Sequence, residues 1–246
     1  MNLDHPSTHH IPQLRLLWQE AFGDSDEALD AFFQTAFDPA RCLCAWEGEE
    51  LAAVAYWFAC GEYAYIYAVA TAKAHRGKGL CHALMNSIHR LLTAQGYVGA
   101  MVVPGEESLR QFYAGMGYEN FGGIREFSCQ AGLEAATLAE IDTETFAALR
   151  RQYLPRGGVI QEGENLAYLA RFARFYAGKD FLLTATETDE GLFGMELLGN
   201  AEAAPGILTA LGQKTGIFRT QGEVPWGMHK PLGHKNSPTY LGFAFD

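Results

Sequence analysis

Long apolar runs are missing from this sequence of 246 residues, and so are the marks of a secreted chain. The longest uninterrupted run, Leu51 to Cys60, has ten residues, whereas a membrane-spanning helix needs about 20. The segment Met1 to His5 lacks the basic and apolar pattern of a signal peptide. Five cysteines, an odd number without a CxxC pair, suit a reducing compartment. We therefore expect a cytoplasmic protein that makes no membrane contact.

Positive charge is also scarce, because 18 Lys and Arg residues face 29 Asp and Glu residues, for a formal charge of −11. A chain without a basic stripe cannot neutralise phosphates, so we expect no nucleic-acid partner. The excess of carboxylates mildly favours a cationic substrate. An acidic cluster from Asp24 to Asp30, with Asp24 as the expected N-cap, either attracts an amine or simply starts a helix. The histidines of the first ten residues fit a polar terminus, and we expect no metal site.

The segment from Tyr63 to Leu80 carries the most information. Tyr63, Tyr65 and Tyr67 alternate with small or aliphatic residues, which predicts a strand with both faces covered. Gly77 and Gly79 follow it and can adopt positive φ, leaving successive backbone N–H groups open at the start of a helix. The turn is therefore a predicted anion cradle, and the alternative is a tight strand-to-helix turn without a ligand.

Two common phosphate motifs do not fit this turn. The dinucleotide fingerprint needs a third glycine where this chain has His82, and the nucleotide-triphosphate loop needs Gly-Lys-Ser or Gly-Lys-Thr, whereas Lys78 precedes Gly79. The run Arg76-Gly77-Lys78-Gly79-Leu80-Cys81 instead resembles the pyrophosphate loop of the GNAT superfamily of acyl-CoA-dependent N-acyltransferases. That loop reads Arg or Gln, two residues, Gly, one residue, then Gly or Ala, so only Cys81 departs from it.

A second stretch extends the resemblance. The run from Glu106 to Tyr118 contains Phe112-Tyr113 and Gly117-Tyr118 and is similar to the family's helix and its "FY…GF" ending. Glu106 stands where the family usually has Asn. The resemblance covers roughly Gln13 to Cys129.

The resemblance implies a set of roles in binding acetyl-CoA as co-substrate. The pantetheine arm would pair with the backbone around Val69, Ala70 and Thr71. The diphosphate would bind the amides of Arg76, Gly77, Lys78, Gly79, Leu80 and Cys81. Tyr113 would protonate the leaving thiolate, and its alternative role is that of a core aromatic residue. The general base stays open between carboxylates such as Glu62 and Asp246.

The predicted architecture is α/β (α+β), a mixed sheet with helices on both faces. We assign residues 1–130 to a GNAT-like acyl-CoA-binding domain that ends in a hairpin from Tyr118 to Cys129. We assign residues 131–246 to a degenerate GNAT-like domain that packs on the first and lacks the glycine turn. In this second part we expect a helix capped by Thr137 and Glu140, another helix through Phe175 and Tyr176, and a last strand from Tyr240 to Phe245.

Three functions fit these features. The first is an N-acetyltransferase that moves an acetyl group from acetyl-CoA to a small-molecule or peptidyl amine. The second is an inactive acyl-CoA-binding sensor or scaffold. The third is a tandem acyltransferase using another carrier, such as an aminoacyl-tRNA, for which the acidic charge is a handicap. We expect a monomer built as an intrachain pseudo-dimer, or a homodimer.

Overall fold

The computed structural model describes residues 1–233 and 237–245. The chain forms two compact units, and neither is a single stretch of sequence. One unit comprises Met1–Glu119 with Met228–Asn236, and the other comprises Asn120–Gly227 with Ser237–Asp246. The division expected from the sequence, 1–130 and 131–246, assumed two contiguous parts. No helix within the described residues combines the length and the apolar character that crossing a bilayer demands.

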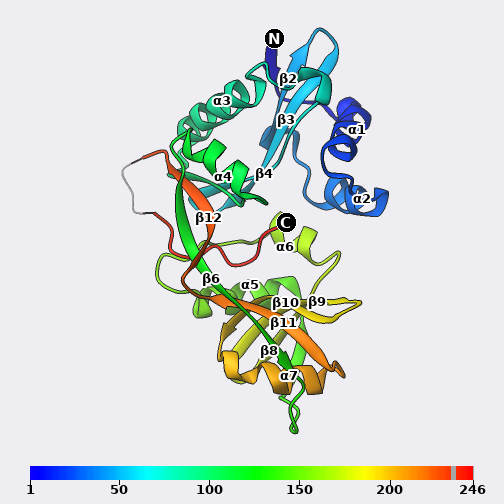
Figure 1. Cartoon of the computed structure of the whole chain (residues 1–246), viewed down its shortest axis with the longest axis vertical. Helices are drawn as coiled ribbons and strands as arrows, with labels where there is room; N and C mark the ends of the chain where they lie inside the picture. Colours follow the sequence, from blue (N-terminus) through cyan, green and yellow to red (C-terminus); the bar gives the residue numbers. More distant parts are fainter. Residues whose placement is uncertain (234–236, 246) are drawn as a thin grey trace. The chain divides into compact units, whose positions relative to one another are not determined.

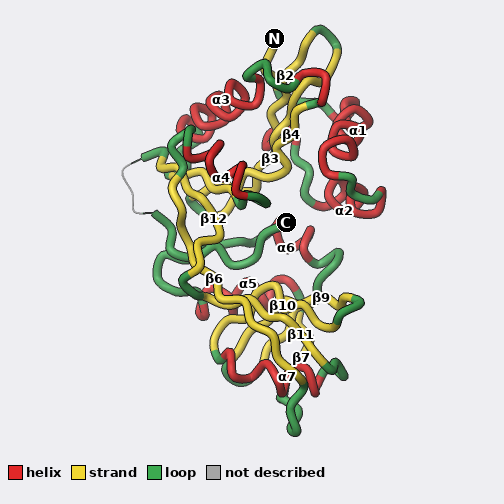
Figure 2. Tube along the Cα trace, in the orientation of Figure 1, coloured by secondary structure: helices red, strands yellow, loops and turns green. Residues whose placement is uncertain are grey.

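The first unit contains a mixed sheet in the order β1-β2-β3-β4-β5-β12. Its neighbours are antiparallel except for the parallel pair β4–β5. Strands β2, β3 and β4 run side by side (Figure 2). The bounds are β1 Asn2–Asp4, β2 Cys42–Glu47, β3 Glu50–Cys60, β4 Tyr63–Thr71 and β5 Gly99–Val102, with Met228–Pro231 from β12 Val224–Pro231.

Helices cover both faces of this sheet (Figure 1). On one face lie α1 Ile11–Phe22 and α2 Asp26–Thr35, and on the other lie α3 Leu80–Ala94 and α4 Glu107–Ala114. Because neither face meets water, β2 and β3 are apolar along almost their whole length and do not alternate. Leu84, Ile88 and Leu92 of α3 are each fully buried against the sheet. The α1–α2 face is instead packed with aromatic rings, centred on Trp18 and Phe32.

The second unit contains mixed-sheet strands in the order β6-β11-β10-β9-β8-β7. Its strands are β6 Glu119–Gln130, β7 Leu138–Ile141, β8 Arg174–Gly178, β9 Phe181–Thr188, β10 Gly191–Gly199 and β11 Thr215–Gln221. Its helices are α5 Thr143–Tyr153, α6 Glu164–Leu169 and α7 Ala204–Ala210. A core around Phe218, Leu197 and Ile207 is fully buried beneath α7.

The path β10–α7–β11 repeats the path β4–α3–β5 of the first unit. Strands β10 and β11 are parallel and pair from Leu192↔Gly216 to Gly194↔Phe218, and β4 pairs with β5 from Tyr63↔Gly99 to Tyr65↔Met101. Each path therefore joins parallel neighbours through one crossover helix. The predicted α/β mixed-sheet class is confirmed.

A buried ion pair holds the end of the chain in the second unit. Arg150 Nε and Nη2 donate to the two carboxylate oxygens of Glu196 at 2.7 and 2.9 Å, and both residues are 1% exposed. Arg150 Nη2 also donates to the carbonyl oxygen of Leu241, and Gln161 Nε2 donates to the carbonyl oxygens of Leu241 and Phe243. The segment that the sequence predicted as a strand, Tyr240 to Phe245, forms an isolated bridge at Tyr240 and no strand, and side chains satisfy the carbonyls of Leu241 and Phe243.

Three further predictions from the sequence were wrong. The expected hairpin from Tyr118 to Cys129 is the single strand β6, paired with β11 far along the chain. Its glycines allow close approach rather than a turn, since a Cβ on Gly123 would lie 2.0 Å from the carbonyl oxygen of Gly222.

The other two errors concern helices. Thr137 directly precedes β7 and Glu140 lies on that strand. Helix α5 begins only after Asp142, whose carboxylate accepts from the N–H of Thr145 at 2.7 Å. Phe175 and Tyr176 lie on β8 because the preceding helix ends at Leu169. Over so few residues, the spacing of the apolar side chains fits the period of a helix as well as that of a strand.

Candidate active site

A bulge in β4 marks the centre of the first unit's sheet. Val54↔Ala70 and Tyr56↔Tyr67 are paired, so the single residue Ala55 faces Ala68 and Val69. Ala68 has φ +48°, the one positive φ of a non-glycine residue within the described part of the chain. This conformation costs an L-residue about 1–2 kcal/mol, and such strain commonly marks a functional position.

Strands β4 and β5 separate at the same place. Their parallel pairing ends at Tyr65↔Met101, while β4 continues to Thr71. Val69 and Thr71 are half-buried on this part of β4. The strand edge there can pair with an extended ligand, as the prediction for Val69, Ala70 and Thr71 requires.

The glycine turn has the predicted conformation. Gly77 and Gly79 both have φ +75°, and Gly79 is the N-cap of the 15-residue helix α3 without a capping side chain. Within the described residues, no backbone carbonyl or side chain accepts a hydrogen bond from the N–H groups of Gly77 to His82. A Cβ on either glycine would meet nothing within 4 Å, so the amides lie on an open surface. These donors and the positive end of the α3 dipole form an anion site.

Charged side chains surround this turn. Arg76 Nε donates to the carbonyl oxygen of Thr71 at 3.1 Å, which joins the turn to the end of β4. Lys78 Nζ lies 3.4 Å from Glu47 Oε2 and 3.2 Å from Nδ1 of the buried His75. Its hydrogen bond is the main cause that lowers the pKa of Glu47. Lys78 is half-exposed and can exchange Glu47 for a phosphate oxygen.

Tyr113 lies on α4 and is buried, with 7% of its surface exposed. It belongs to the apolar core with Leu80 and Leu84 of α3, so its ring has a packing role as well. Burial, and after it the nearby Cys81 thiol, raises the pKa of Tyr113 well above the ordinary value. At neutral pH its hydroxyl therefore stays protonated and can donate a proton or a hydrogen bond.

Cys81 lies in the first turn of α3 and interacts with Tyr113 and Tyr118. The two sequence motifs are thus brought together in space. Burial raises the pKa of the Cys81 thiol to about 11. The side chain is neutral at physiological pH, which argues against a nucleophilic role.

A buried polar pair lies behind Tyr113. His89 Nε2 is 2.7 Å from the hydroxyl oxygen of Tyr118, and the two side chains are 6% and 2% exposed. Burial, and then Lys230, lowers the pKa of His89 to about 4, so the imidazole is neutral. Tyr118 contacts Tyr113 edge to face at 5.5 Å between ring centroids.

Of the two candidate bases, Glu62 lies away from the bulge. Glu62 precedes Ala68 by six residues, which is about 20 Å along an extended strand. Asp246 lies outside the described residues. No group of three or more His, Cys, Asp or Glu side chains that could hold a metal occurs in 1–233 and 237–245.

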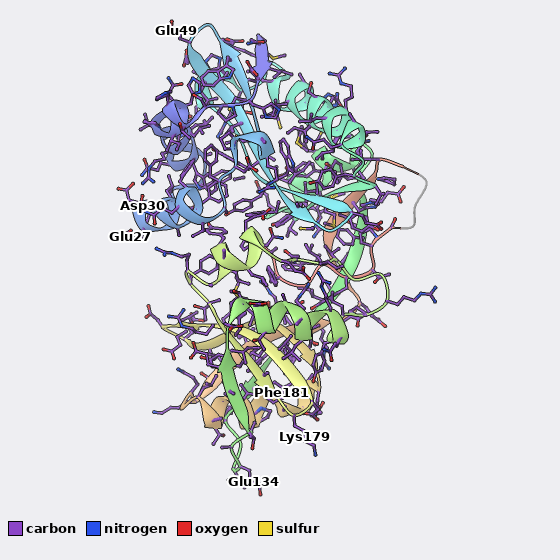
Figure 3. The ribbon with its side chains drawn as sticks, turned by 180° about the vertical axis from the view of Figure 1, so that it is seen from behind. Glu27, Asp30, Glu49, Glu134, Lys179 and Phe181 are labelled. Carbon is purple, nitrogen blue, oxygen red and sulfur yellow. The ribbon has the colours of Figure 1, made fainter. Side chains whose placement is uncertain are left out.

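The acidic cluster differs in detail from its prediction. Asp24 was expected as the N-cap of α2, but Ser25 caps it and accepts from the N–H of Ala28 at 3.3 Å. The Asp24 carboxylate instead accepts from Trp18 Nε1 at 2.7 Å. Asp26 and Asp30 pair with Arg15, and Figure 3 shows Asp30 projecting outward from α2. Part of the cluster's charge is therefore already neutralised.

Several residues of the site carried no readable signal in the sequence. The bulge at Ala68 lies within an uninterrupted apolar strand, and β12 returns from the end of the chain to pair with β5. Glu47 lies on the β2–β3 hairpin, whose tip carries Glu49 (Figure 3), and it reaches Lys78 only through the fold. His89 belongs to no motif in the sequence, and it reaches the Tyr118 hydroxyl only through the fold.

Comparison with known proteins gives this geometry a context. Residues 3–121 match the family described as an acetyltransferase (GNAT) domain. No curated protein sequence matches the chain at a significant level.

Similar solved structures include a GCN5-related N-acetyltransferase from Anabaena variabilis, at 15% identity and a TM-score of 0.76, which covers 94% of this chain and 73% of that one. A probable N-acyltransferase from Enterococcus faecalis shares 16% identity with a TM-score of 0.71, over 94% of this chain and 72% of that one. A putative acetyltransferase from Pyrococcus horikoshii shares 12% identity with a TM-score of 0.67, over 99% and 94% of the two chains. At such identities the likeness establishes the fold alone.

Proposed function

Because residues 3–121 of this chain form a GNAT acetyltransferase domain, we propose that the protein transfers an acetyl group from acetyl-CoA to an amine of a small molecule or peptide. The observation that carries the proposal is the glycine turn. Successive N–H groups from Gly77 to His82 lack acceptors within the described residues, at the positive end of a 15-residue helix. A carrier with a diphosphate supplies the missing acceptors.

In this proposal the cofactor follows the features of the first unit. The diphosphate binds the amides of the glycine turn, with Lys78 exchanging Glu47 for phosphate. The pantetheine amides pair with the open edge of β4 at Val69 to Thr71. The thioester then lies beside the bulge at Ala68, where the extra residue of the bulge can offer an unpaired backbone N–H to polarise its carbonyl.

Tyr113 is the proposed acid. The amine nitrogen attacks the thioester carbon, and the carbon–sulfur bond breaks as the tetrahedral intermediate collapses. The Tyr113 hydroxyl gives its proton to the departing sulfur, and the proton lost from the amine replaces it through solvent. Its raised pKa keeps the hydroxyl protonated at neutral pH, so it can donate to the negative charge that develops on the sulfur. Most of the rate enhancement in this scheme comes from placing the amine against the thioester.

We also propose that the second unit is a degenerate copy without a carrier site. Between β10 and α7 the chain has Asn200, whose side chain caps a short turn, and no glycine pair that opens the backbone. In this proposal acetyl-CoA binds once per chain. The chain acts as a monomer or assembles into a homodimer.

Binding and turnover are tested separately. Calorimetry with acetyl-CoA should give one site per chain, and a panel of amines assayed for CoA release should identify an acceptor. No binding of acetyl-CoA would overturn the proposal. Binding without CoA release from any amine would favour an acyl-CoA sensor instead.

A further inference from the structure

Tyr118 carries a hydroxyl into the apolar core beneath α3 and α4. Its side chain is 2% exposed and lies among Leu84, Ile88 and Tyr113. A buried hydroxyl without a partner destabilises the fold, whereas a phenylalanine at this position would need none. His89 supplies the partner at 2.7 Å. This chain thus maintains a buried polar pair where an apolar pair would pack as well.

Both members of the pair are neutral at physiological pH. Burial lowers the pKa of His89 to about 4, and burial raises the pKa of Tyr118. The pair is therefore a hydrogen bond between two uncharged groups and not an ion pair. His89 Nδ1 is itself buried, and within the described residues it has no hydrogen-bond partner. Packing alone does not require such an arrangement, because it leaves one polar atom unsatisfied.

The pair is linked to Tyr113 through both backbone and ring. The Tyr118 N–H donates to the carbonyl oxygen of Tyr113 at 3.1 Å, and the Met116 N–H donates to the same oxygen at 2.9 Å. The rings of Tyr113 and Tyr118 meet at an interplanar angle of 63°. Lys230 Nζ, from β12, donates to the carbonyl oxygen of Met116 at 2.5 Å and closes the turn from outside. The hydrogen bond at the Tyr118 hydroxyl therefore holds the Tyr118 ring in place, and that ring limits the orientations open to the Tyr113 ring.

We propose that His89, through its hydrogen bond to Tyr118, is a positioning residue that aims the Tyr113 hydroxyl at the sulfur of the cofactor. The inference rests on the proposed function for its final step. His89 does not touch the reacting atoms. It sets the orientation of a neighbour that does, and a small misplacement of a reacting group is enough to lower the rate about 100-fold.

Three variants separate positioning from packing. Tyr118→Phe leaves His89 Nε2 without a partner and should lower both thermal stability and kcat. The double variant H89L/Y118F removes both polar groups and replaces them with apolar side chains of similar shape. We expect it to recover most of the stability while kcat stays at least about 10-fold below wild type. Ile88→Val is the control, because it loosens the packing around Tyr118 while both polar groups of the pair stay in place.

Epistasis with Tyr113 provides the second readout. When Tyr113→Phe has already removed the acid, H89L/Y118F should lower kcat no further, since the pair would then aim a hydroxyl that is absent. Full recovery of kcat in the double variant, or losses that multiply with Tyr113→Phe, would overturn the inference and leave a packing role.

A binding measurement keeps the inference testable if no amine acceptor is found. A hydroxyl aimed at sulfur favours CoA over acetyl-CoA, because a thiol or thiolate accepts its hydrogen bond better. Tyr113→Phe and H89L/Y118F should then lower the ratio of the Kd for acetyl-CoA to the Kd for CoA, and by a similar factor. Ile88→Val should leave this ratio unchanged. A shift for Tyr113→Phe alone would refute positioning, and a wild type that binds neither ligand would refute the proposed function itself.

Discussion

Replacing Gly79 by valine tests the anion site directly. Gly79 has φ +75°, and a Cβ there would meet nothing within 4 Å. The substitution therefore introduces backbone strain and a side chain over the amides, without a clash in the core. Gly96, at the other end of α3, has φ +86° and equally open surroundings. Gly96→Val is a matched control, because it strains the same helix away from the turn.

The two variants should lose similar stability. A side chain in this left-handed conformation costs about 1–2 kcal/mol, and each kcal/mol lowers the Tm of a chain of this size by about 2–4 °C. Both variants should therefore melt about 2–8 °C below wild type. Ligand binding should differ, because two N–H bonds to a charged diphosphate contribute about 1.5–3 kcal/mol each. Losing both weakens acetyl-CoA binding by at least about 100-fold in Gly79→Val.

Calorimetric titration with acetyl-CoA measures this difference, and thermal melts without ligand verify that the strain is matched. The expected result is a weak or undetectable Kd for Gly79→Val and a Kd within about twofold of wild type for Gly96→Val. Equal affinities in the two variants, at equal Tm, would refute the assignment of the glycine turn as the carrier site.

Three other outcomes follow from the structure. Tyr113→Phe should lower kcat by about 10² to 10⁴-fold with the Kd for acetyl-CoA unchanged, and a parallel loss of binding would indicate a packing role. Arg150→Met should lower the free energy of unfolding in urea by about 3–5 kcal/mol, because it leaves Glu196 buried and unpaired. The double variant R150M/E196L should lose much less stability, and equal losses in the two variants would contradict the buried-pair argument. Burial lowers the pKa of His89 and His229 to about 4, so the unfolded chain binds protons between about pH 6.5 and 4 that the folded chain excludes. Stability should fall as the pH drops through that window, by about 2 kcal/mol for each histidine at pH 5, and urea unfolding of H89L/Y118F should show a shallower pH slope than wild type.

Local chemistry was readable from the sequence. The conformation of a turn depends on the few residues within it, and Gly77 and Gly79 adopt the positive φ that their lack of a side chain allows. Helix α3 follows the apolar stripe through Leu84, Ile88 and Leu92, because a helical period is repeated within one segment. The resemblance to the GNAT superfamily depended on such short motifs, and the domain match over residues 3–121 confirms it.

Pairings between distant segments were decided only by the tertiary structure. Strand β6 was mistaken for a hairpin because its glycines are typical of a turn. In the fold, Gly123 instead allows the backbone at Gly222 to approach closely. Strand β12 joins β5 across more than a hundred residues, and no local pattern encodes its register. The bulge at Ala68 and the contact of His89 with Tyr118 likewise depend on what the opposite element presents. Side-chain spacing determines which face of an element is apolar, but only the closed sheet and its packed helices determine which partner that face meets.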